Sequence, residues 1–313
     1  MSVKRPIIID CDTGTDDAIA IIAALGCEEI SILGLTSVNG NVSENYTSQN
    51  NLDMMEYLDR DIPVFHGAWL PLKASRDTGA GDNVHGKTGL GDVELPRAER
   101  RKMEGERAAE FIYRMALRYP GQLEIIATGP LTNVALAIIE HDDIKALIRK
   151  IYFMGGATEG GNVTPSAEFN IWVDPEACHT VLASGIPTVM VGLNVSNQAT
   201  MGNGEIERLR GYGSREGRLA ADIIHYQMNR FGIGIGFSRM HDPLTLAAAL
   251  YPECLSFREC FVDAECRGDY TRGHTYVDLR NRSGRQPNCS VAVGIDVEKF
   301  REWLCERIRR AGE

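Results

Sequence analysis

Apolar runs rich in β-branched residues alternate with helical patterns through the first part of the chain. The apolar runs lie in PIIIDCD, SILGLTSV, LEIIAT, KIYFMGG and IPTVMVGLNV, and the helical patterns in DDAIAIIAAL, residues 45–57, LTNVALAII and DPEACHTVLA. Within the runs the Ile and Val residues are continuous, which is typical of strands covered on both faces. The pattern predicts an α/β fold with an open, doubly wound, mostly parallel sheet and a Rossmann-like core.

Two stretches interrupt this alternation. Residues 66–103 are long and rich in Gly, Asp and Arg, which indicates a loop excursion, and residues 200–241 are predicted to be helical, most clearly over 216–228. Beyond residue 250 the pattern predicts short strands in FRECFVDAEC, GHTYVDL and CSVAVGID, then a final helix over 297–310. No repeat or linker is visible, so residues 1–313 are expected to form a single domain.

The composition of the chain limits the classes of molecule that it is expected to bind and the compartment in which it is expected to lie. The 33 basic and 43 acidic side chains give a formal charge of -10, a poor match for nucleic acid or anionic lipid, so neither is expected to bind. No apolar run approaches the roughly 20 residues of a membrane span, and residues 1–6 lead into a strand without a signal-peptide core, so a cytoplasmic location is expected. The eight cysteines contain no C-x-x-C pair, which favours free thiols over disulfides or a zinc site.

Four aspartates follow the first apolar run, in IIIDCDTGTDDAI at residues 7–19. Asp10, Asp12, Asp16 and Asp17 repel one another at this spacing, so a cation or a strongly polarised partner is expected beside them. Asp10 and Asp12 point to one side of a strand, whereas Asp16 and Asp17 fall at a helix N-terminus. Oxygen-only ligands suit Ca²⁺ or Mg²⁺ better than zinc. For Asp10, a structural role in orienting the loop is equally consistent.

Other phosphate or metal motifs fit less well. An EF-hand loop starting at Asp10 would require Gly and Glu where the chain has Thr15 and Ile21. A DxDxT/V phosphatase would require Thr or Val where the chain has Gly14, and it stays open as a weaker alternative. GDNVHGKT at residues 81–88 matches the phosphate-binding P-loop letter for letter, but no strand precedes it and no helix pattern follows, so we interpret the match as accidental.

The aspartate segment DCDTGTDDA resembles the N-terminal D-x-D-x-G-x-D-D signature of the inosine-uridine-preferring nucleoside hydrolases. Further segments resemble that family in the same order and approximate spacing, so the resemblance covers essentially the whole chain; they are TSVNGNVS, HGKTGL, ATGPLTNVA, FMGG, GNVTPSAEFNIWVDPEA and MHDPL. The resemblance implies a Ca²⁺-dependent enzyme that hydrolyses the N-glycosidic bond of ribonucleosides to ribose and a free base. It also implies a homodimer or homotetramer.

The resemblance implies a role for each matching residue. Asp12, Asp17 and Asp242, with the backbone carbonyl of Thr128, would bind the Ca²⁺, and Asp12 would also accept a proton from the attacking water. His241 would assist departure of the base, since imidazole suits proton donation near neutral pH. The remaining matching positions would contact the substrate; they are Asp16, Asn41, His85, Asn162, Glu168 and Asn170.

Two departures from the family pattern concern the base. The chain has GLNVS at residues 192–196 where the family often has GLDVT, and YQMNRFGIGIGFSRM at 226–240 does not align with the aromatic-rich helix of relatives. Tyr226, Asn229 and Phe231 are candidates for a base pocket, and the choice among uridine, cytidine, inosine and adenosine stays open. A protein that binds ribose or a nucleoside without cleaving it is the alternative from a different class.

Overall fold

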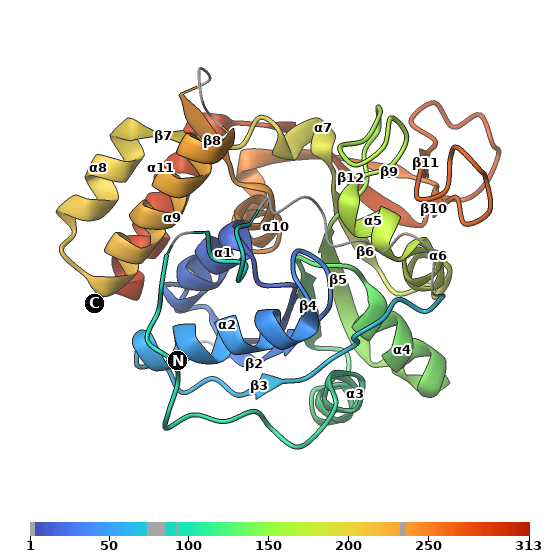
Figure 1. The fold of residues 1–313 in the computed structure, drawn as a ribbon. Coiled ribbons are helices and arrows are strands. Elements are labelled where there is room, and N and C mark those ends of the chain that lie inside the picture. The colour runs from blue at the N-terminus through green and yellow to red at the C-terminus, as the bar shows by residue number, and fades with distance from the viewer. Residues whose placement is uncertain (1–3, 74–84, 92, 232–235) are drawn as a thin grey trace.

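The computed structural model describes residues 4–73, 85–91, 93–231 and 236–313. Its centre is an eight-stranded sheet in the order β3-β2-β1-β4-β5-β6-β12-β9, in which β9 runs antiparallel to β12 and the other neighbours are parallel. This confirms the predicted mostly parallel α/β sheet (Figure 1). The strands are β1 (Arg5–Cys11), β2 (Ile30–Ser37), β3 (Val64–Phe65), β4 (Leu123–Ala127), β5 (Ile148–Met154), β6 (Thr188–Val191), β9 (Leu255–Cys260) and β12 (Cys289–Ile295).

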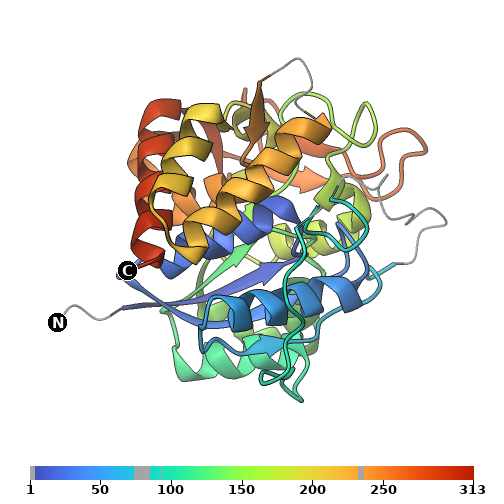
Figure 2. The same cartoon turned by 60° about the vertical axis from the view of Figure 1, so that its left-hand side comes forward.

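Helices cover both faces of this sheet (Figures 1 and 2). One hydrophobic cluster joins the sheet to α1 (Thr15–Leu25), α2 (Glu44–Tyr57), α8 (Asn203–Gly211), α9 (Arg215–Phe231), α10 (His241–Leu250) and α11 (Val297–Ala311). A second cluster joins the other face to α3 (Ala108–Arg118), α4 (Thr132–Glu140) and α6 (Pro175–Ala183). Short helices complete the chain; they are α5 (Phe169–Val173), α7 (Leu193–Ser196), η1 (Asp142–Ala146) and η2 (Pro252–Cys254).

The apolar run of β1 shows why the sheet is covered twice. Side chains alternate across a strand, so Ile7 and Ile9 pack in the first cluster and Ile8 in the second, all essentially without exposure. Burying each of these side chains stabilises the fold by about 1.5–3 kcal/mol, and a polar residue at any of the three would forfeit it. In the described part of the chain no helix is long and apolar enough to cross a membrane.

Two small antiparallel pairs lie outside the central sheet. One joins β10 (Val262–Ala264) to β11 (Thr275–Val277), both within segments that the sequence predicted to be strands, and the other joins β7 (Thr200–Gly202) to β8 (Phe237–Arg239). The second pair corrects the wholly helical interpretation of residues 200–241. Three-residue strands are too short to show a period of two, and their pairing partner is distant in sequence.

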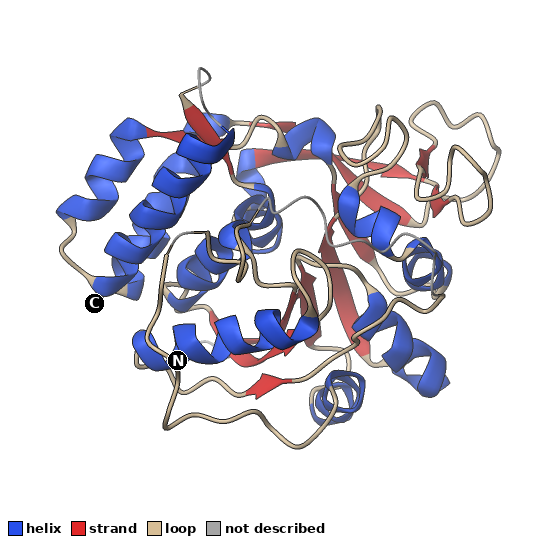
Figure 3. Ribbon diagram, viewed as in Figure 1, coloured by secondary structure: helices blue, strands red, loops and turns tan. Residues whose placement is uncertain are grey.

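The long excursion after β3 is a loop where it is described, as Figure 3 shows in tan. Within the P-loop match, residues 81–84 lie outside the described residues, and residues 85–88 form a turn. The next helix, α3, begins only at Ala108. Residues 85–91 therefore provide no helix N-terminus for a phosphate, in agreement with the interpretation of that match as accidental. The single domain over residues 1–313 stays a prediction.

Candidate active site

Three buried carboxylates meet where α1 and α10 begin, at the carboxyl edge of the sheet. Asp16 and Asp17 lie in the first turn of α1 and Asp242 in the first turn of α10. One carboxylate oxygen from each lies within 4.8 Å of the other two, and each residue is at most 6% exposed. Carboxylates in a first helical turn face the positive end of the helix dipole, which offsets part of their repulsion.

Asp17 is held by hydrogen bonds from three different segments. Its Oδ2 accepts from the Gly14 backbone N–H at 2.9 Å and from Asn41 Nδ2 at 3.0 Å, and its Oδ1 accepts from Thr128 Oγ1 at 2.6 Å. Gly14 precedes the helix because nothing larger fits: a Cβ there would lie 2.6 Å from both Asn41 Nδ2 and His85 Nδ1. The Gly14 position thus brings α1, Asn41 and His85 together.

Asp12 follows β1 and is enclosed by backbone. Its Oδ2 accepts a hydrogen bond of 2.7 Å from the Asn41 backbone N–H. A Cβ on Gly40 would lie 2.1 Å from Oδ2, and one on Gly129 would lie 2.9 Å from Oδ1. These two glycines let the main chain close around the carboxylate, so its orientation is fixed.

The electrostatics of this site favour a positive partner. Burial and the neighbouring carboxylates raise the pKa of Asp12 and of Asp242 well above the usual range, and burial followed by the charge of Asp17 raises the pKa of Asp16 to about 7. Within the residues that the structure describes, no Lys or Arg forms an ion pair with any of them. Oxygen donors that are buried and uncompensated in this way fit a hard divalent cation.

Asp10 lies in a network of its own beneath the site. Its Oδ1 accepts hydrogen bonds from Thr36 Oγ1 at 2.6 Å and from Asn133 Nδ2 at 2.8 Å, while Oδ2 is buried without a hydrogen-bond partner. Burial raises its pKa to about 6. Since Asn133 also donates to the Ser37 carbonyl, Asp10 links the ends of neighbouring strands. These contacts favour the structural role for Asp10.

The residues expected to bind the cation lie together, with one difference from the resemblance. Asp17 and Asp242 belong to the three-residue group, and Thr128 donates to Asp17. Asp16, expected to contact ribose, completes the group, whereas Asp12 lies outside it and acts on Asp242 through its charge. The Thr128 carbonyl accepts from Asn170 Nδ2 at 2.7 Å, which leaves its second lone pair for a cation.

Both candidate histidines reach this edge of the sheet. His241 precedes Asp242, and its Nδ1 lies 2.8 Å from Ser196 Oγ. Burial, then the charges of Arg239 and His85, lowers the pKa of His241 to about 4, and burial lowers that of His85 to about 4 as well. Both imidazoles are therefore neutral near pH 7. Ser196 belongs to GLNVS, so this departure from the family keeps a hydroxyl beside His241.

The other residues expected to bind substrate organise the loop before α5. The Glu168 carboxylate accepts from the backbone N–H groups of Gly156, Asn170 and Ile171 and caps the helix, and its burial raises its pKa to about 7. Asn162 Oδ1 accepts from the Phe169 N–H at 2.9 Å. Much of the hydrogen-bonding capacity of these side chains is therefore committed to the backbone.

Two of the three base-pocket candidates line a cavity beside α9. Tyr226 and Asn229 line a cavity of about 610 Å³ with Val93, Glu94, Asp222, His225 and Arg230. Tyr226 packs on Gly91, in the loop that carries His85, and Asn229 is exposed and lies 3.0 Å from His225. The side chain of Phe231 lies outside the described residues. A base pocket built from these three residues stays a prediction.

The sequence interpretation missed Gln227, which points from α9 toward the site. Its Nε2 donates to Thr15 Oγ1 at 2.9 Å, and its Oε1 accepts from Ser238 Oγ at 2.8 Å. A signal was present, because Gln227 continues the apolar stripe formed by Ala220, Ile223 and Ile224. A polar residue on the buried face of an amphipathic helix requires a hydrogen-bond partner.

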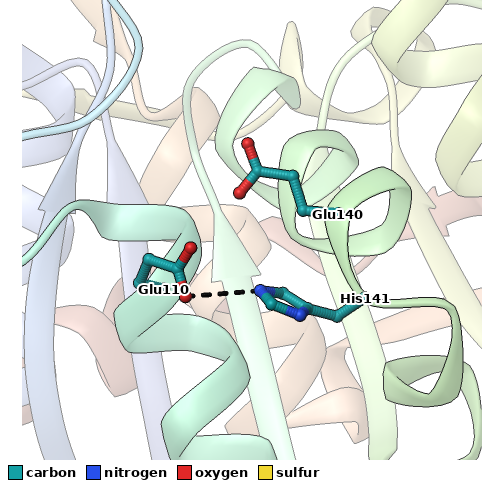
Figure 4. A group of neighbouring side chains, drawn as sticks. All are labelled: Glu110, Glu140 and His141. Atoms are coloured by element: carbon teal, nitrogen blue, oxygen red, sulfur yellow. Dashed lines mark ion pairs between the residues drawn. The ribbon is translucent and has the colours of Figure 1, made fainter.

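A second group with suitable metal-ligand spacing lies between α3 and α4. It consists of Glu110, Glu140 and His141, whose ligand atoms also lie within 4.8 Å of one another (Figure 4). Arg107 Nη2 lies 3.0 Å from Glu110 Oε1 and 3.0 Å from Glu140 Oε2, and His141 Nε2 lies 3.3 Å from Glu110. Its negative charge is therefore compensated by side chains. We interpret this group as a surface ion-pair network.

The cysteines agree with the expectation of free thiols. All eight are unpaired, and each is buried apart from the half-buried Cys266. In the described ranges, no cysteine belongs to a group with metal-ligand spacing. Burial raises the pKa of Cys289 to about 12, as expected for an unreactive thiol.

A doubly wound α/β sheet with a buried group of carboxylates at its carboxyl edge is typical of proteins that bind small ligands there. The sequence model of the family described as inosine-uridine preferring nucleoside hydrolase matches residues 7–302. The chain belongs to this family. The assignment confirms the resemblance drawn from the motifs and makes the chain a nucleoside hydrolase.

Individual relatives agree with the assignment. The chain is 41% identical over 310 residues to the pyrimidine-specific ribonucleoside hydrolase RihA of Salmonella paratyphi A, covering 97% of this chain and 98% of the relative. It superimposes on the purine-preferring ribonucleoside hydrolase of Gardnerella vaginalis with a TM-score of 0.92, at 33% identity over 98% of this chain and 99% of that one. A plant nucleoside hydrolase gives a TM-score of 0.92 at 30% identity over 98% and 99%. These similarities confirm the fold.

Proposed function

We propose that the protein catalyses the Ca²⁺-dependent hydrolysis of the N-glycosidic bond of pyrimidine ribonucleosides, releasing ribose and the free base. The observation that carries the proposal is the group of buried, uncompensated carboxylates at the carboxyl edge of the sheet, in a chain of the nucleoside hydrolase family. Without a cation this arrangement costs free energy through both burial and mutual repulsion. Buried titratable groups with strongly shifted pKa values are concentrated at functional sites.

The residues that would hold the cation are Asp12, Asp17, Asp242 and the Thr128 carbonyl. All are oxygen donors, as Ca²⁺ prefers. When bound, Ca²⁺ would offset the carboxylate charge, bind the ribose hydroxyls and favour ionisation of an attacking water. Asp16 lies within the same group, so it would hold a ribose hydroxyl immediately beside the ion.

Asp12 would accept the proton of the attacking water. The Asn41 N–H and the main chain at Gly40 and Gly129 fix its carboxylate, so no reorientation is needed before proton transfer. As the base departs, the ribose ring gains positive charge, which the surrounding carboxylates stabilise. The same acidic pocket would thus provide both the proton acceptor and the negative charge that stabilises the ribose ring.

His241 would assist the departing base as a hydrogen-bond donor. Burial lowers the pKa of His241 to about 4, so a neutral ring N–H makes the contact at pH 7. Its Nδ1 lies against Ser196 Oγ, which leaves Nε2 for the substrate side. A donor at this point stabilises the negative charge that develops on the base.

The loop residues retain free atoms for the ribose. A carboxylate can accept about four hydrogen bonds, and Glu168 accepts three from the backbone, so one remains. Asn162 uses its Oδ1 and Asn170 its Nδ2, which leaves the other amide atom of each for a hydroxyl. Several such contacts would reject a deoxyribose substrate, because a missing hydroxyl leaves buried polar groups unpaired.

The comparisons support the proposed preference for pyrimidines. The RihA relative, named pyrimidine-specific, shares 41% of its residues with this chain, against 33% for the purine-preferring structure. We also propose that the protein is cytoplasmic and forms a homodimer or homotetramer. Trp69 and Leu70, 58% and 67% exposed, support a subunit contact because such side chains are commonly covered in assemblies.

The test is ribose release from uridine, cytidine, inosine and adenosine, measured as reducing sugar with Ca²⁺ and with a strong chelator. We expect the pyrimidine nucleosides to be cleaved at least about ten times faster than the purine nucleosides, and the chelator to abolish turnover. Nucleoside binding without ribose release would instead support the binding-protein alternative. Phosphate release from nitrophenyl phosphate would support the phosphatase, and faster cleavage of inosine would overturn the pyrimidine preference.

A further inference from the structure

A directed chain of hydrogen bonds ends on His85. Ser238 Oγ donates to Gln227 Oε1 at 2.8 Å, Gln227 Nε2 donates to Thr15 Oγ1 at 2.9 Å, and Thr15 Oγ1 lies 2.9 Å from His85 Nδ1. The Thr15 backbone N–H also donates to His85 Nδ1, at 3.1 Å. These hydrogen bonds join β8, α9, the start of α1 and the loop at residues 85–91.

The Thr15 backbone N–H decides which nitrogen of His85 carries the proton. A backbone N–H can only donate, so the Thr15 N–H requires an unprotonated His85 Nδ1. The Thr15 hydroxyl accepts from Gln227, so its own hydrogen is free to point at the same nitrogen. In the structure Ser238 Oγ donates to Gln227 Oε1, and the amide NH₂ faces Thr15. The proton of the neutral imidazole is therefore on Nε2.

The second nitrogen of the His85 ring, Nε2, has no hydrogen-bond partner among the described residues. The residue is half-buried, its ring lies against Gly14 and Thr15, and it is close enough to Asp17 for that charge to act on it. An oriented N–H donor at the site without a protein acceptor is available to a ligand.

We propose that Thr15 and Gln227 are positioning residues that hold His85 as the neutral Nε2–H tautomer, so that Nε2–H donates a hydrogen bond to an acceptor atom of the bound nucleoside. That the acceptor atom belongs to a nucleoside rests on the proposed function, whereas the tautomer of His85 does not. These hydrogen bonds explain why a glutamine, a threonine and a serine are buried together at this point. Each side chain is the hydrogen-bond partner of the next, so removing one leaves its neighbours unpaired.

The tautomer is tested directly by nitrogen NMR of the histidine rings in the full-length protein at neutral pH. A His85→Gln variant identifies the His85 signals by their loss. We expect Nδ1 to give the signal of an unprotonated nitrogen and Nε2 that of a protonated one. The opposite tautomer, or a ring protonated on both nitrogens, would overturn the proposal whether or not the enzyme is active.

A matched pair of variants separates the hydroxyl of Thr15 from its shape. Thr15→Val keeps the shape and removes the hydroxyl, whereas Thr15→Ser keeps the hydroxyl and removes a methyl group. We expect Thr15→Val to lower kcat for uridine by about 10- to 100-fold and to shift the His85 Nδ1 signal, and Thr15→Ser to stay within a few-fold of wild type in both. A purely packing role predicts the reverse order, and that result would overturn the proposal.

Gln227 is tested in the same way. Gln227→Met keeps the length but cannot donate to Thr15, so we expect it to resemble Thr15→Val in both kcat and the nitrogen spectrum. Thr180→Val is the control, since the Thr180 hydroxyl donates to the Glu176 carbonyl within α6 and belongs to no site. Wild-type turnover with unchanged His85 signals in Gln227→Met would remove Gln227 from the proposal. No turnover in wild type would contradict the proposed function and leave the spectra as the test of the tautomer.

Discussion

The molecule contains two groups of side chains with the spacing of metal ligands, and they behave differently. Asp16, Asp17 and Asp242 are buried at the carboxyl edge of the sheet, whereas Glu110, Glu140 and His141 are half-buried or exposed between α3 and α4. Ligand spacing alone does not distinguish them, because in both groups the atoms lie within 4.8 Å. The difference is what surrounds each group.

Burial and the available counter-charge decide the outcome. At the sheet edge, burial and neighbouring carboxylates raise the pKa of Asp16 to about 7, and hydrogen bonds alone oppose that effect. Between α3 and α4, Arg107 lies 3.0 Å from both glutamates, and solvent screens what remains. The described residues therefore supply no counter-charge to the first group, whereas Arg107 supplies one to the second.

The largest expected effect on turnover is that of replacing Asp12, which lies beside the buried group. Asp12→Asn keeps the size of the side chain but lowers its ability to accept a proton, so kcat for uridine should fall by about 10²- to 10⁴-fold. Glu140→Gln is the matched control in the other group and should leave kcat unchanged. Steady-state kinetics with saturating Ca²⁺ provide the measurement. If Asp12→Asn stays within a few-fold of wild type while folded, Asp12 does not accept the proton.

A smaller effect concerns the stability of the metal-free protein at different pH values. The folded-state pKa values of Asp16 (about 7), Glu168 (about 7) and Asp10 (about 6) are raised above their unfolded values near 4. The folded chain then holds protons that the unfolded chain releases, so this contribution to stability is complete below about pH 4 and is lost as the pH rises to about 7. Chelated protein should unfold several degrees higher at pH 5.5 than at pH 7.5.

Added Ca²⁺ should remove much of this pH dependence, because it compensates the carboxylates at pH 7.5 and competes with protons at pH 5.5. Thermal unfolding with chelator and with Ca²⁺ at the two pH values measures both effects. Asp16→Asn, which cannot ionise, should show a weaker pH dependence without metal. If chelated wild-type protein is equally or more stable at pH 7.5, ionisation of these carboxylates does not destabilise the fold.

The sequence predicted the central sheet well because its signal is local. Continuous apolar runs such as Ile7 to Ile9 can be satisfied only by burial on two faces, and the helical patterns between them imply parallel crossovers. The pairing of β7 with β8 was not predictable in the same way. Residues 200–202 and 237–239 are short and far apart in sequence, so only the folded chain reveals that they pair.

The candidate site was predictable in part for a similar reason. The aspartates stand out because four acids in eight positions are unusual next to an apolar strand, and their place at a strand end implies the carboxyl edge. Ser196 and Gln227 carry no such signal. Each acquires its importance from a partner more than 40 residues away, His241 and Thr15 respectively, so single-sequence patterns could show only that Gln227 is a polar residue on an apolar face.

The smallest expected effect tests the second group itself. Glu140→Gln removes one carboxylate from Arg107, which keeps Glu110 as a partner, so the free energy of unfolding should change by no more than about 1 kcal/mol. Urea unfolding of both proteins, with and without Zn²⁺, measures this change. Zn²⁺ should not stabilise the wild type more than the variant, since Arg107 would have to be displaced first. A wild-type protein stabilised by Zn²⁺ beside an unaffected Glu140→Gln would mean that exposure and an arginine partner do not exclude a metal, and that the contrast between the two groups is wrong.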